Sequence, residues 1–201
     1  LDNFNFQIKH YGLNTVAEFN EFKEAINLQP NPARQFRIAG LVTEAQHRIS
    51  KTGNKFGIFF VEDYTSKMEL MLWREDYVRL SNFLEPGMVV CLSGAFVQRF
   101  KTSPFEFKVN GVTLLESLMQ SATKKLQIEL HPKDVTKELI DFFDRNMHEH
   151  PGNTTVKFCV QDSSSKLKFG MYALENGFEM NDEMANYLLE KPELGIQVEF
   201  T

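Results

Sequence analysis

The hydrophobic positions between residues 36 and 109 follow a strand period and predict a β-rich domain. At its centre are a dense run of β-formers, a four-residue turn and an alternating apolar segment, at residues 56–62, 63–66 and 67–73. Two strand signals across such a turn predict a β-hairpin.

Other elements surround this hairpin. A long strand candidate at residues 36–48 precedes it. After it come a short helical pattern at 74–84, a turn at 85–87, and two strands at 88–100 and 105–109. Three strands, a helix and two more strands fit a five-stranded OB-fold barrel. In that fold, strands 2 and 3 and the loops after strands 1 and 4 form the binding surface.

The first strand of the hairpin, which is the second strand of the expected barrel, is apolar on both faces. Gly57, Phe59 and Val61 can face the core, and Phe56 and Phe60 then face the groove of the barrel. Because neither face is polar, one must be covered by a helix or must bind a ligand. OB-folds hold single-stranded nucleic acid by stacking bases on aromatic side chains.

Both loops expected beside that groove are basic, at residues 48–55 and 99–105. Their basic residues are Arg48, Lys51, Lys55, Arg99 and Lys101. If the OB-fold hypothesis holds, these cations converge with Phe56, Phe60 and Phe100 on one nucleic-acid-binding groove. We expect Phe60 and Phe100 to stack bases and not to belong to the core. The alternative also stays open: the apolar face packs under a helix, and the basic loops are only solvated.

Charge is unevenly distributed along the chain, whose formal net charge is −5. Residues 33–120 carry 11 Lys and Arg against 9 Asp and Glu, whereas residues 121–201 carry 9 against 14. A slightly basic middle and an acidic tail favour an anionic partner for the middle part only.

The remaining pattern completes the domain organisation. Residues 1–28 are helical in period, Thr15 and Glu18 are spaced for a capping box, and the prolines within residues 29–32 predict a boundary. Residues 120–125 are polar and predict a linker. Beyond them, a strand–helix–strand–strand–helix–strand pattern predicts a small α/β sandwich.

The expected fold class is therefore mixed β and α/β. We expect a short N-terminal helical segment over residues 1–32, an OB-fold domain over 33–119 and a β-α-β-β-α-β domain over 120–201.

Composition narrows the class of protein. Hydrophobic residues are 42% and charged residues 24%, which is typical of a soluble, foldable chain. No apolar run approaches the roughly 18 residues of a membrane helix, and no signal peptide is visible. We expect a cytoplasmic protein that does not contact a membrane, with Cys91 and Cys159 as buried thiols without a disulfide. The chain begins at Leu1 and not at Met, so we expect a piece of a longer protein.

Catalytic and cofactor motifs are missing from the sequence. There is no GxSxG, P-loop or GxGxxG pattern, so we expect no active site and no cofactor in this chain. His148 and His150 are the nearest approach to metal ligands, but their spacing points them apart on a helix, and we expect no metal. Asp63 is expected to accept backbone N–H groups of its turn and not to act as a catalytic carboxylate.

Several motifs together resemble a known family. They are residues 38–43, Arg48, 51–53, 56–66, 68–69, Trp73, Gly94, Arg99 and 150–152. With them the chain resembles the C-terminal region of the bacterial DNA polymerase III alpha subunit, most specifically in the OB part. It departs from that pattern at Ser66, where the hairpin turn usually has Gly, and at Phe60, where a smaller or polar residue is common.

This resemblance implies a non-catalytic C-terminal part of a replicative polymerase, whose catalytic palm and clamp-binding peptide would lie upstream. It implies an OB domain that binds single-stranded DNA template. It also implies a C-terminal domain that docks the clamp-loader tau subunit, with other replisome proteins as further partners. We expect the apolar anchors of that docking at exposed aromatic residues such as Phe178 and Tyr187, because aromatic residues dominate interface hot spots.

Two other functions stay open. One is a tRNA-binding OB module of the kind attached to aminoacyl-tRNA synthetases. The other is a protein–protein scaffold whose groove never contacts nucleic acid.

Overall fold

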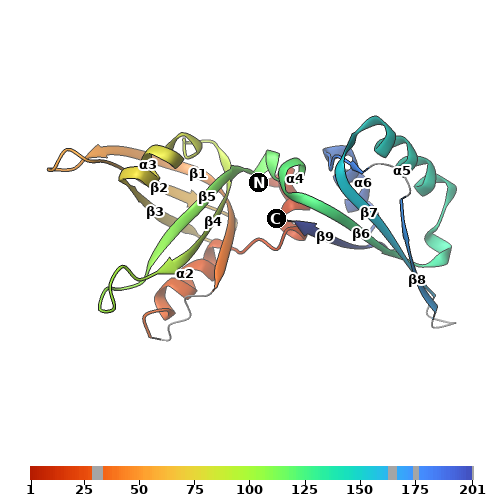
Figure 1. Cartoon of the computed structure of the whole chain (residues 1–201), viewed down its shortest axis with the longest axis horizontal. Helices are drawn as coiled ribbons and strands as arrows, with labels where there is room; N and C mark the ends of the chain where they lie inside the picture. The colour runs from red at the N-terminus through yellow and green to blue at the C-terminus, as the bar shows by residue number, and fades with distance from the viewer. Residues whose placement is uncertain (29–33, 163–166, 174–176, 201) are drawn as a thin grey trace. The chain divides into compact units, whose positions relative to one another are not determined.

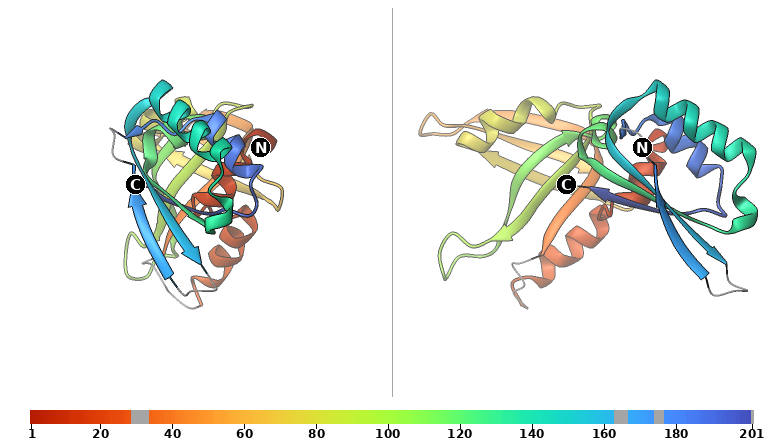
Figure 2. Two further views of the ribbon diagram at one scale, coloured as in Figure 1. Left: turned by 90° about the vertical axis from the view of Figure 1, so that its right-hand side faces the viewer. Right: turned by 45° about the vertical axis from the view of Figure 1, so that its right-hand side comes forward.

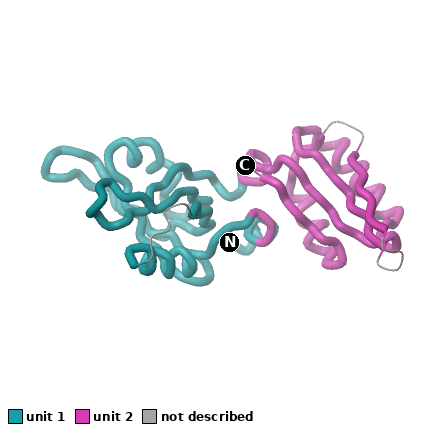
Figure 3. The backbone as a smooth tube through the Cα atoms, turned by 60° about the horizontal axis from the view of Figure 1, so that its bottom comes forward, with its two compact units in different colours: residues 1–8, 12–117 teal, residues 9–11, 118–201 magenta. Residues whose placement is uncertain are grey.

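The structure is a computed structural model that describes residues 1–28, 34–162, 167–173 and 177–200 (Figure 1). The chain divides into two compact units (Figure 3). Unit 1 comprises residues 1–8 and 12–117, and unit 2 comprises residues 9–11 and 118–201. The boundary expected at residues 29–32 lies outside the described residues.

Unit 1 is built on a five-stranded antiparallel sheet in the order β3-β2-β1-β4-β5. Its strands are β1 (Gln35–Ile49), β2 (Lys55–Glu62), β3 (Lys67–Trp73), β4 (Val89–Val97) and β5 (Glu106–Leu114). The helix α3 (Arg74–Leu80) and the short 3-10 helix η2 (Ser81–Phe83) lie between β3 and β4. This is the expected strand order of an OB-fold, with β3 and β5 at the two ends of the sheet.

The β2–β3 hairpin supplies much of the core of unit 1. Its four-residue turn pairs Glu62 with Lys67, and the same register places Phe59 opposite Leu70. Phe59 and Leu70 are buried, as is every second residue along both strands in this part of the hairpin. The prediction that one face of β2 enters the core is therefore confirmed.

Most of the N-terminal segment belongs to unit 1, and residues 9–11 belong to unit 2. It contains η1 (Asp2–Phe4), α1 (Asn5–His10) and α2 (Val16–Ala25). The expected capping box at the start of α2 is present: Glu18 N–H donates to Thr15 Oγ1 (3.1 Å), and Thr15 N–H donates to Glu18 Oε2 (3.0 Å). Because Phe19 of α2 packs into the core of the barrel, this helix is part of the OB unit and not a separate lead-in.

Asp63 ties the hairpin turn to the start of α2. Its Oδ1 accepts the Thr65 hydroxyl (2.6 Å) and the N–H groups of Thr65 (2.8 Å) and Ser66 (3.0 Å), while its Oδ2 accepts Val16 N–H (2.8 Å). The expected capping of the turn is confirmed, and the same carboxylate also satisfies an N–H group that the first turn of a helix leaves free.

These hydrogen bonds set the acidity of Asp63. Burial alone would raise the pKa of the carboxyl group, but the hydrogen bonds from the Thr65 hydroxyl and from three backbone N–H groups outweigh it, so the pKa lies below its ordinary value.

Unit 2 is an α/β sandwich. Its sheet has the order β8-β7-β6-β9, from β6 (Thr123–Leu130), β7 (Pro151–Asp162), β8 (Leu167–Tyr172) and β9 (Gly195–Phe200). Its helices are the end of α4 (Leu115–Ala122), η3 (Pro132–Asp134), α5 (Lys137–Glu149) and α6 (Asp182–Leu189). β6 and β7 are parallel, the other pairs are antiparallel, and α5 and α6 lie on one face of the sheet (Figure 2). The predicted element order is confirmed.

Residues 120–125 are not a linker, contrary to the prediction. Helix α4 ends at Ala122 and β6 begins at Thr123, and both residues are buried. The Thr123 hydroxyl donates to Met119 O (2.6 Å) and lies 2.5 Å from the Tyr11 hydroxyl. Because these contacts satisfy the hydroxyl group, a residue that appears polar in sequence can be buried here.

Both cysteines are free and buried, as expected. Among the described residues, no helix combines the length and the apolar composition needed to cross a bilayer.

We expect Asp63→Ala to lower the free energy of unfolding by about 1–2 kcal/mol, because it removes a helix cap together with the bonds of the turn. Since the pKa is lowered in the folded state, the unfolded chain takes up the proton first as the pH falls. The stabilisation from ionised Asp63 is therefore full above its ordinary pKa and is lost as the pH falls through the folded value. Urea unfolding at a series of pH values from 7 down to below the ordinary pKa of Asp measures this pH dependence of stability. Asp63→Asn is the variant that cannot titrate. Equal acid sensitivity of Asp63→Asn and wild type would contradict the role of the carboxylate.

Candidate nucleic-acid interface

The outer face of the β2–β3 hairpin is apolar and aromatic. The register pairs Phe56 with Trp73, Ile58 with Met71, and Phe60 with Glu69. Side chains of paired residues point to the same face of a sheet, so these three pairs form successive rows on the side opposite the core.

The first row is an aromatic stack. The rings of Phe56 and Trp73 lie 4.4 Å apart, centroid to centroid, at an interplanar angle of 13°. Trp73 is 42% exposed and Met71 in the next row 41%. Exposed aromatic surface of this kind can stack nucleobases, and such stacking does not depend on base identity.

Trp73 also lines a groove of about 740 Å³ in unit 1. Residues 69–73 of β3 and the start of α3 form one wall, and Val97, Arg99 and residues 105–109 form the other, with Phe19 and Lys23 contributing. The groove therefore runs along the side where β3 and β5, the two ends of the sheet order, face each other. Four basic and four acidic residues line it: Lys23, Arg74, Arg99, Lys108, Glu69, Glu75, Asp76 and Glu106.

Four of the sequence-predicted residues gather at the β1–β2 turn. Arg48 is the register partner of Phe56, so the two side chains share the outer face, and its guanidinium donates to Gln46 Oε1. Lys51 and Lys55 are exposed at the turn, whose Gly53 has φ of 78°. A residue with a side chain is strained at that φ, so Gly53 suits this tight turn.

Three others occupy the β4–β5 turn. Arg99 lines the groove, and its Nε lies 3.6 Å from Glu106 Oε2 in an exposed ion pair. Phe100 is 73% exposed, and Lys101 is exposed beside it. In Figure 1 the β1–β2 turn extends to the upper left of unit 1 and the β4–β5 turn to its lower left. Arg99 and Trp73 lie on the two walls of the groove, whereas Arg48, Lys51, Lys55 and Phe56 are not among the described residues that line it.

Phe60 lies apart from these groups. It is four residues further along β2 than Phe56, which is about 13 Å at strand spacing. Its ring is half-buried, and Lys67 Nζ lies 4.6 Å from the ring centroid. Phe60 is outside the core, but a cation already occupies one face of its ring.

Trp73 and Met71 were not among the sequence-predicted site residues. The signal that would have found them is the four-residue turn, because pairing Glu62 with Lys67 fixes every later pair down to Phe56 with Trp73.

In unit 2, the expectation that Phe178 is exposed is wrong, since its exposed fraction is 0%. Its backbone forms bridges to Pro151 and Thr154 at the start of β7, which hold the side chain inside the unit. Tyr187 is half-buried and stacks on Phe142 with centroids 3.7 Å apart. Both aromatic residues therefore pack within the unit.

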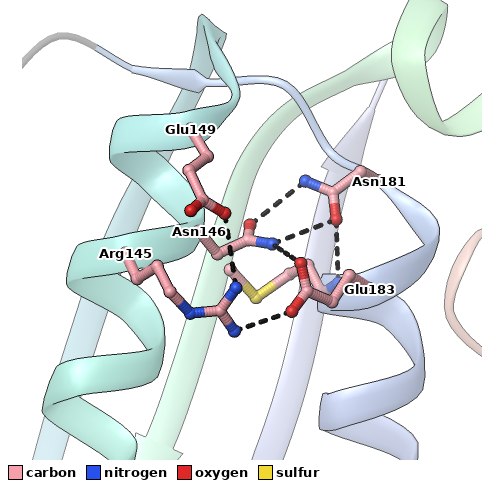
Figure 4. A network of polar contacts seen from close by, with 6 residues as sticks. Arg145, Asn146, Glu149, Asn181 and Glu183 are labelled. Carbon is pink, nitrogen blue, oxygen red and sulfur yellow. Dashed lines mark hydrogen bonds and ion pairs between the residues drawn. The ribbon is translucent and has the colours of Figure 1, made fainter.

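Unit 2 also contains one cluster of possible metal ligands, in which atoms of Glu149, His150 and Glu183 lie within 4.8 Å of one another. Arg145 forms ion pairs with both carboxylates, at 3.3 Å to Glu149 and 2.7 Å to Glu183 (Figure 4). The hydrogen bond from Arg145 lowers the pKa of Glu183. Because a guanidinium already neutralises these carboxylates, we interpret the cluster as an ionic clasp between α5 and α6.

Comparisons with known proteins match each unit separately. Residues 36–115 match the family described as the OB-fold nucleic acid binding domain. Residues 126–199 match the family described as the DNA polymerase III alpha subunit, C-terminal domain. The resemblance drawn from the sequence motifs is thereby confirmed over both units.

Curated relatives agree. DNA polymerase III subunit alpha of Haemophilus influenzae is 25% identical over 179 residues, which are 87% of this chain and 15% of that protein. The Bacillus subtilis subunit is 23% identical over a match that covers 79% of this chain and 14% of its own length. The Pseudomonas aeruginosa subunit is 21% identical over a match that covers 77% of this chain and 13% of its own length. The chain thus spans only about one seventh of the length of these relatives.

One solved structure also aligns, the second OB-fold domain of replication protein A from Methanococcus maripaludis. It covers 42% of this chain and 87% of that chain at 22% identity, with a TM-score of 0.28. A score this low supports no argument, and the fold assignment rests on the strand order and the family match.

Trp73→Ala and Phe100→Ala are each expected to weaken binding of a single-stranded oligonucleotide by about 1–3 kcal/mol, the value of one lost base stack. Phe100→Ala should leave the free energy of unfolding within about 0.5 kcal/mol of the wild-type value, because the Phe100 ring is exposed. Fluorescence anisotropy and thermal unfolding measure the two quantities.

The matched control is Phe59→Ala on the buried side of β2, which should cost about 3–5 kcal/mol of folding free energy. Unchanged oligonucleotide binding by both exposed variants would exclude this face as the stacking surface.

Proposed function

We propose that this chain, a relative of the C-terminal region of the DNA polymerase III alpha subunits, holds single-stranded DNA on unit 1 and docks the clamp-loader tau subunit on unit 2. In this role it is a non-catalytic part of a replicative polymerase. Replication of the bacterial chromosome then implies a cytoplasmic location, and other replisome proteins as neighbours.

One observation carries the DNA-binding part: the Phe56–Trp73 stack on the outer face of β2 and β3, in which Trp73 is exposed and Phe56 is half-buried. Such an aromatic pair is the kind of platform on which OB-folds stack bases. Arg48 on the same face and Arg99 across the groove provide cations for the phosphates.

The charge balance indicates weak, sequence-independent binding. The groove carries as many acidic as basic residues, so attraction of the backbone depends on the two turns. Phosphate contacts supply affinity without reading sequence.

The same residues are also compatible with RNA binding, because base stacking and phosphate contacts do not distinguish DNA from RNA. Only contacts to the 2′-OH distinguish them. The tRNA-binding alternative is disfavoured by unit 2, which matches a polymerase domain. Paired DNA and RNA oligonucleotides of one sequence separate the two hypotheses by affinity.

Changing Arg48, Lys51 and Arg99 together to Ala should weaken binding of single-stranded DNA and flatten its dependence on salt. Each phosphate neutralised adds about 0.7 to the slope of log K against log salt, so the slope should fall by about 2. Titration at several salt concentrations measures it.

A triple Ala variant of Lys124, Lys133 and Lys137 is the matched control. These residues are exposed in unit 2, and removing them changes the net charge by the same amount. If the unit 1 variant keeps the wild-type slope, the DNA site lies elsewhere. If the wild type shows no salt-dependent binding at all, the scaffold alternative is favoured.

Two features support the docking of tau by unit 2. Its excess of acidic residues, 14 against 9 basic over residues 121–201, disfavours DNA as its partner. It also has an apolar edge: Leu167 and Phe169 of β8 are 63% and 51% exposed. Exposed apolar surface of this kind is typical of protein interfaces.

The full chain should therefore bind purified tau of its own replisome, as measured by biolayer interferometry. The triple Ala variant at Arg48, Lys51 and Arg99 should bind tau as well as wild type does, because its changes lie in unit 1. Absence of tau binding by the wild-type chain would refute the docking role and leave the DNA-binding proposal intact.

A further inference from the structure

A second groove, of about 400 Å³, lies in unit 2. Helix α5 contributes one wall, with Leu139, Ile140, Phe143, Asp144 and Met147. The other side is made by the sheet, with Leu130, Phe158, Val160 and Met171, and the ends by Val135 and Ala173. All but one of these residues are apolar. The volume falls in the range of about 300–1,000 Å³ found for ligand pockets.

The groove exists because α5 is held toward α6. Asn146 is fully buried, and it exchanges side-chain hydrogen bonds with Asn181 at 3.3 and 3.1 Å. Arg145 pairs with Glu183 in the same network (Figure 4). The Phe142 ring stacks on Tyr187 of α6. These contacts hold one side of α5 against α6. Its other side, with Ile140 and Met147, faces the groove, where no other described helix packs beside it.

Among the described residues, no element covers strand β8 on that side. Its register with β7 pairs Phe169 with Val160 and Met171 with Phe158, so these side chains point to the face that carries the helices. Every residue of β8 is nonetheless exposed, and Met171 is 47% exposed although it lines the groove. In a sandwich this face is normally covered by another element.

Charge indicates which kind of segment would cover this exposed face. Asp144 is the one charged residue among the described residues that line the groove. It is exposed, and its carboxylate forms no hydrogen bond or ion pair with the side chains of the described residues. Unit 2 as a whole has an excess of acidic residues. An apolar segment that carries basic residues would match both the lining and the field around it.

We propose that the groove between α5 and β8 binds an amphipathic helix of the partner protein, with its apolar stripe on β8 and α5 and a Lys or Arg against Asp144. The proposal rests on the docking role of unit 2 stated above. The bound helix would lie beside α5 as a third helix of the sandwich, a mode of recognition in which an apolar helix face fills an apolar groove.

A partner strand added at the free edge of β8 is the competing arrangement. Strand addition depends on the backbone of β8, whose outward N–H groups alternate along the strand. Ala173 N–H bonds to Val156 O, so by alternation Gly170 N–H points away from β7. A helix in the groove depends instead on side chains of α5, which strand addition does not use.

The test uses the full chain and two probes. The first is purified tau. The second is a fluorescent peptide of about 18 residues, five helical turns, with a Leu stripe and Lys on its polar face. A second peptide, with Glu in place of Lys, is its control. We expect the Lys peptide to bind at least about tenfold more tightly than the Glu peptide.

Ile140→Lys and Met171→Lys should each weaken binding of tau and of the Lys peptide by at least about tenfold. Asp144→Lys should weaken binding of the Lys peptide and strengthen binding of the Glu peptide. A merely structural role of Asp144 would not produce these opposite changes. Val78→Lys, an exposed apolar residue of α3 in unit 1, and Asp141→Lys, an exposed acid of α5 outside the groove, are the matched controls. Gly170→Pro should leave binding unchanged, and thermal unfolding verifies that every variant is folded.

The outcomes separate this proposal from the docking role. If tau binds but the groove variants bind it like wild type, the groove is not the docking site, although the docking role stands. If tau does not bind while the Lys peptide does, with the expected variant effects, the docking role fails and the groove stands as a helix site. Loss of binding in Gly170→Pro alone would overturn the helix in favour of an added strand.

Discussion

The register of β2 on β3 is the constraint on which unit 1 depends. The turn from Asp63 to Ser66 pairs Glu62 with Lys67, and every later pair follows at fixed spacing. A slip of one residue would move all side chains of a strand to the opposite face. It would therefore expose Phe59 and bury Phe56 at the same time. Asp63 secures this turn and the first turn of α2 with one carboxylate, so helix and hairpin support each other.

Because one register serves both faces, core and candidate site are not independent. The buried side needs bulky residues to fill the barrel, and the outer side carries an aromatic stack that the barrel does not need. Local sequence shows that both faces are apolar but not which neighbour covers each. In this chain α2 packs its Phe19 into the core, and the outer aromatic row keeps a 42% exposed Trp73.

The fold was largely predictable because its signals are local. Alternation, helical period and turn residues indicated nearly every strand and helix and both element orders, and the predicted capping box at Thr15 is present. The failures involve contacts distant in sequence. Phe178 is buried because its backbone pairs with residues at the start of β7, and the Thr123 hydroxyl contacts that of Tyr11, 112 residues away in the sequence. No periodicity within a short window reports such partners. Trp73 differs, since the turn length alone would have placed it beside Phe56.

Unit 2 illustrates how a polar network can create an apolar surface. The pairing of Asn146 with Asn181 and of Arg145 with Glu183 fixes α5 against α6. A buried Asn is costly unless its amide is satisfied, so this position of α5 is specified more narrowly than apolar packing alone would achieve. Two helices held together in this way do not cover a four-stranded sheet to its edge, and the side chains of β8 are the ones left exposed. The same interactions that define the α5–α6 layer therefore also define the place where that layer is incomplete.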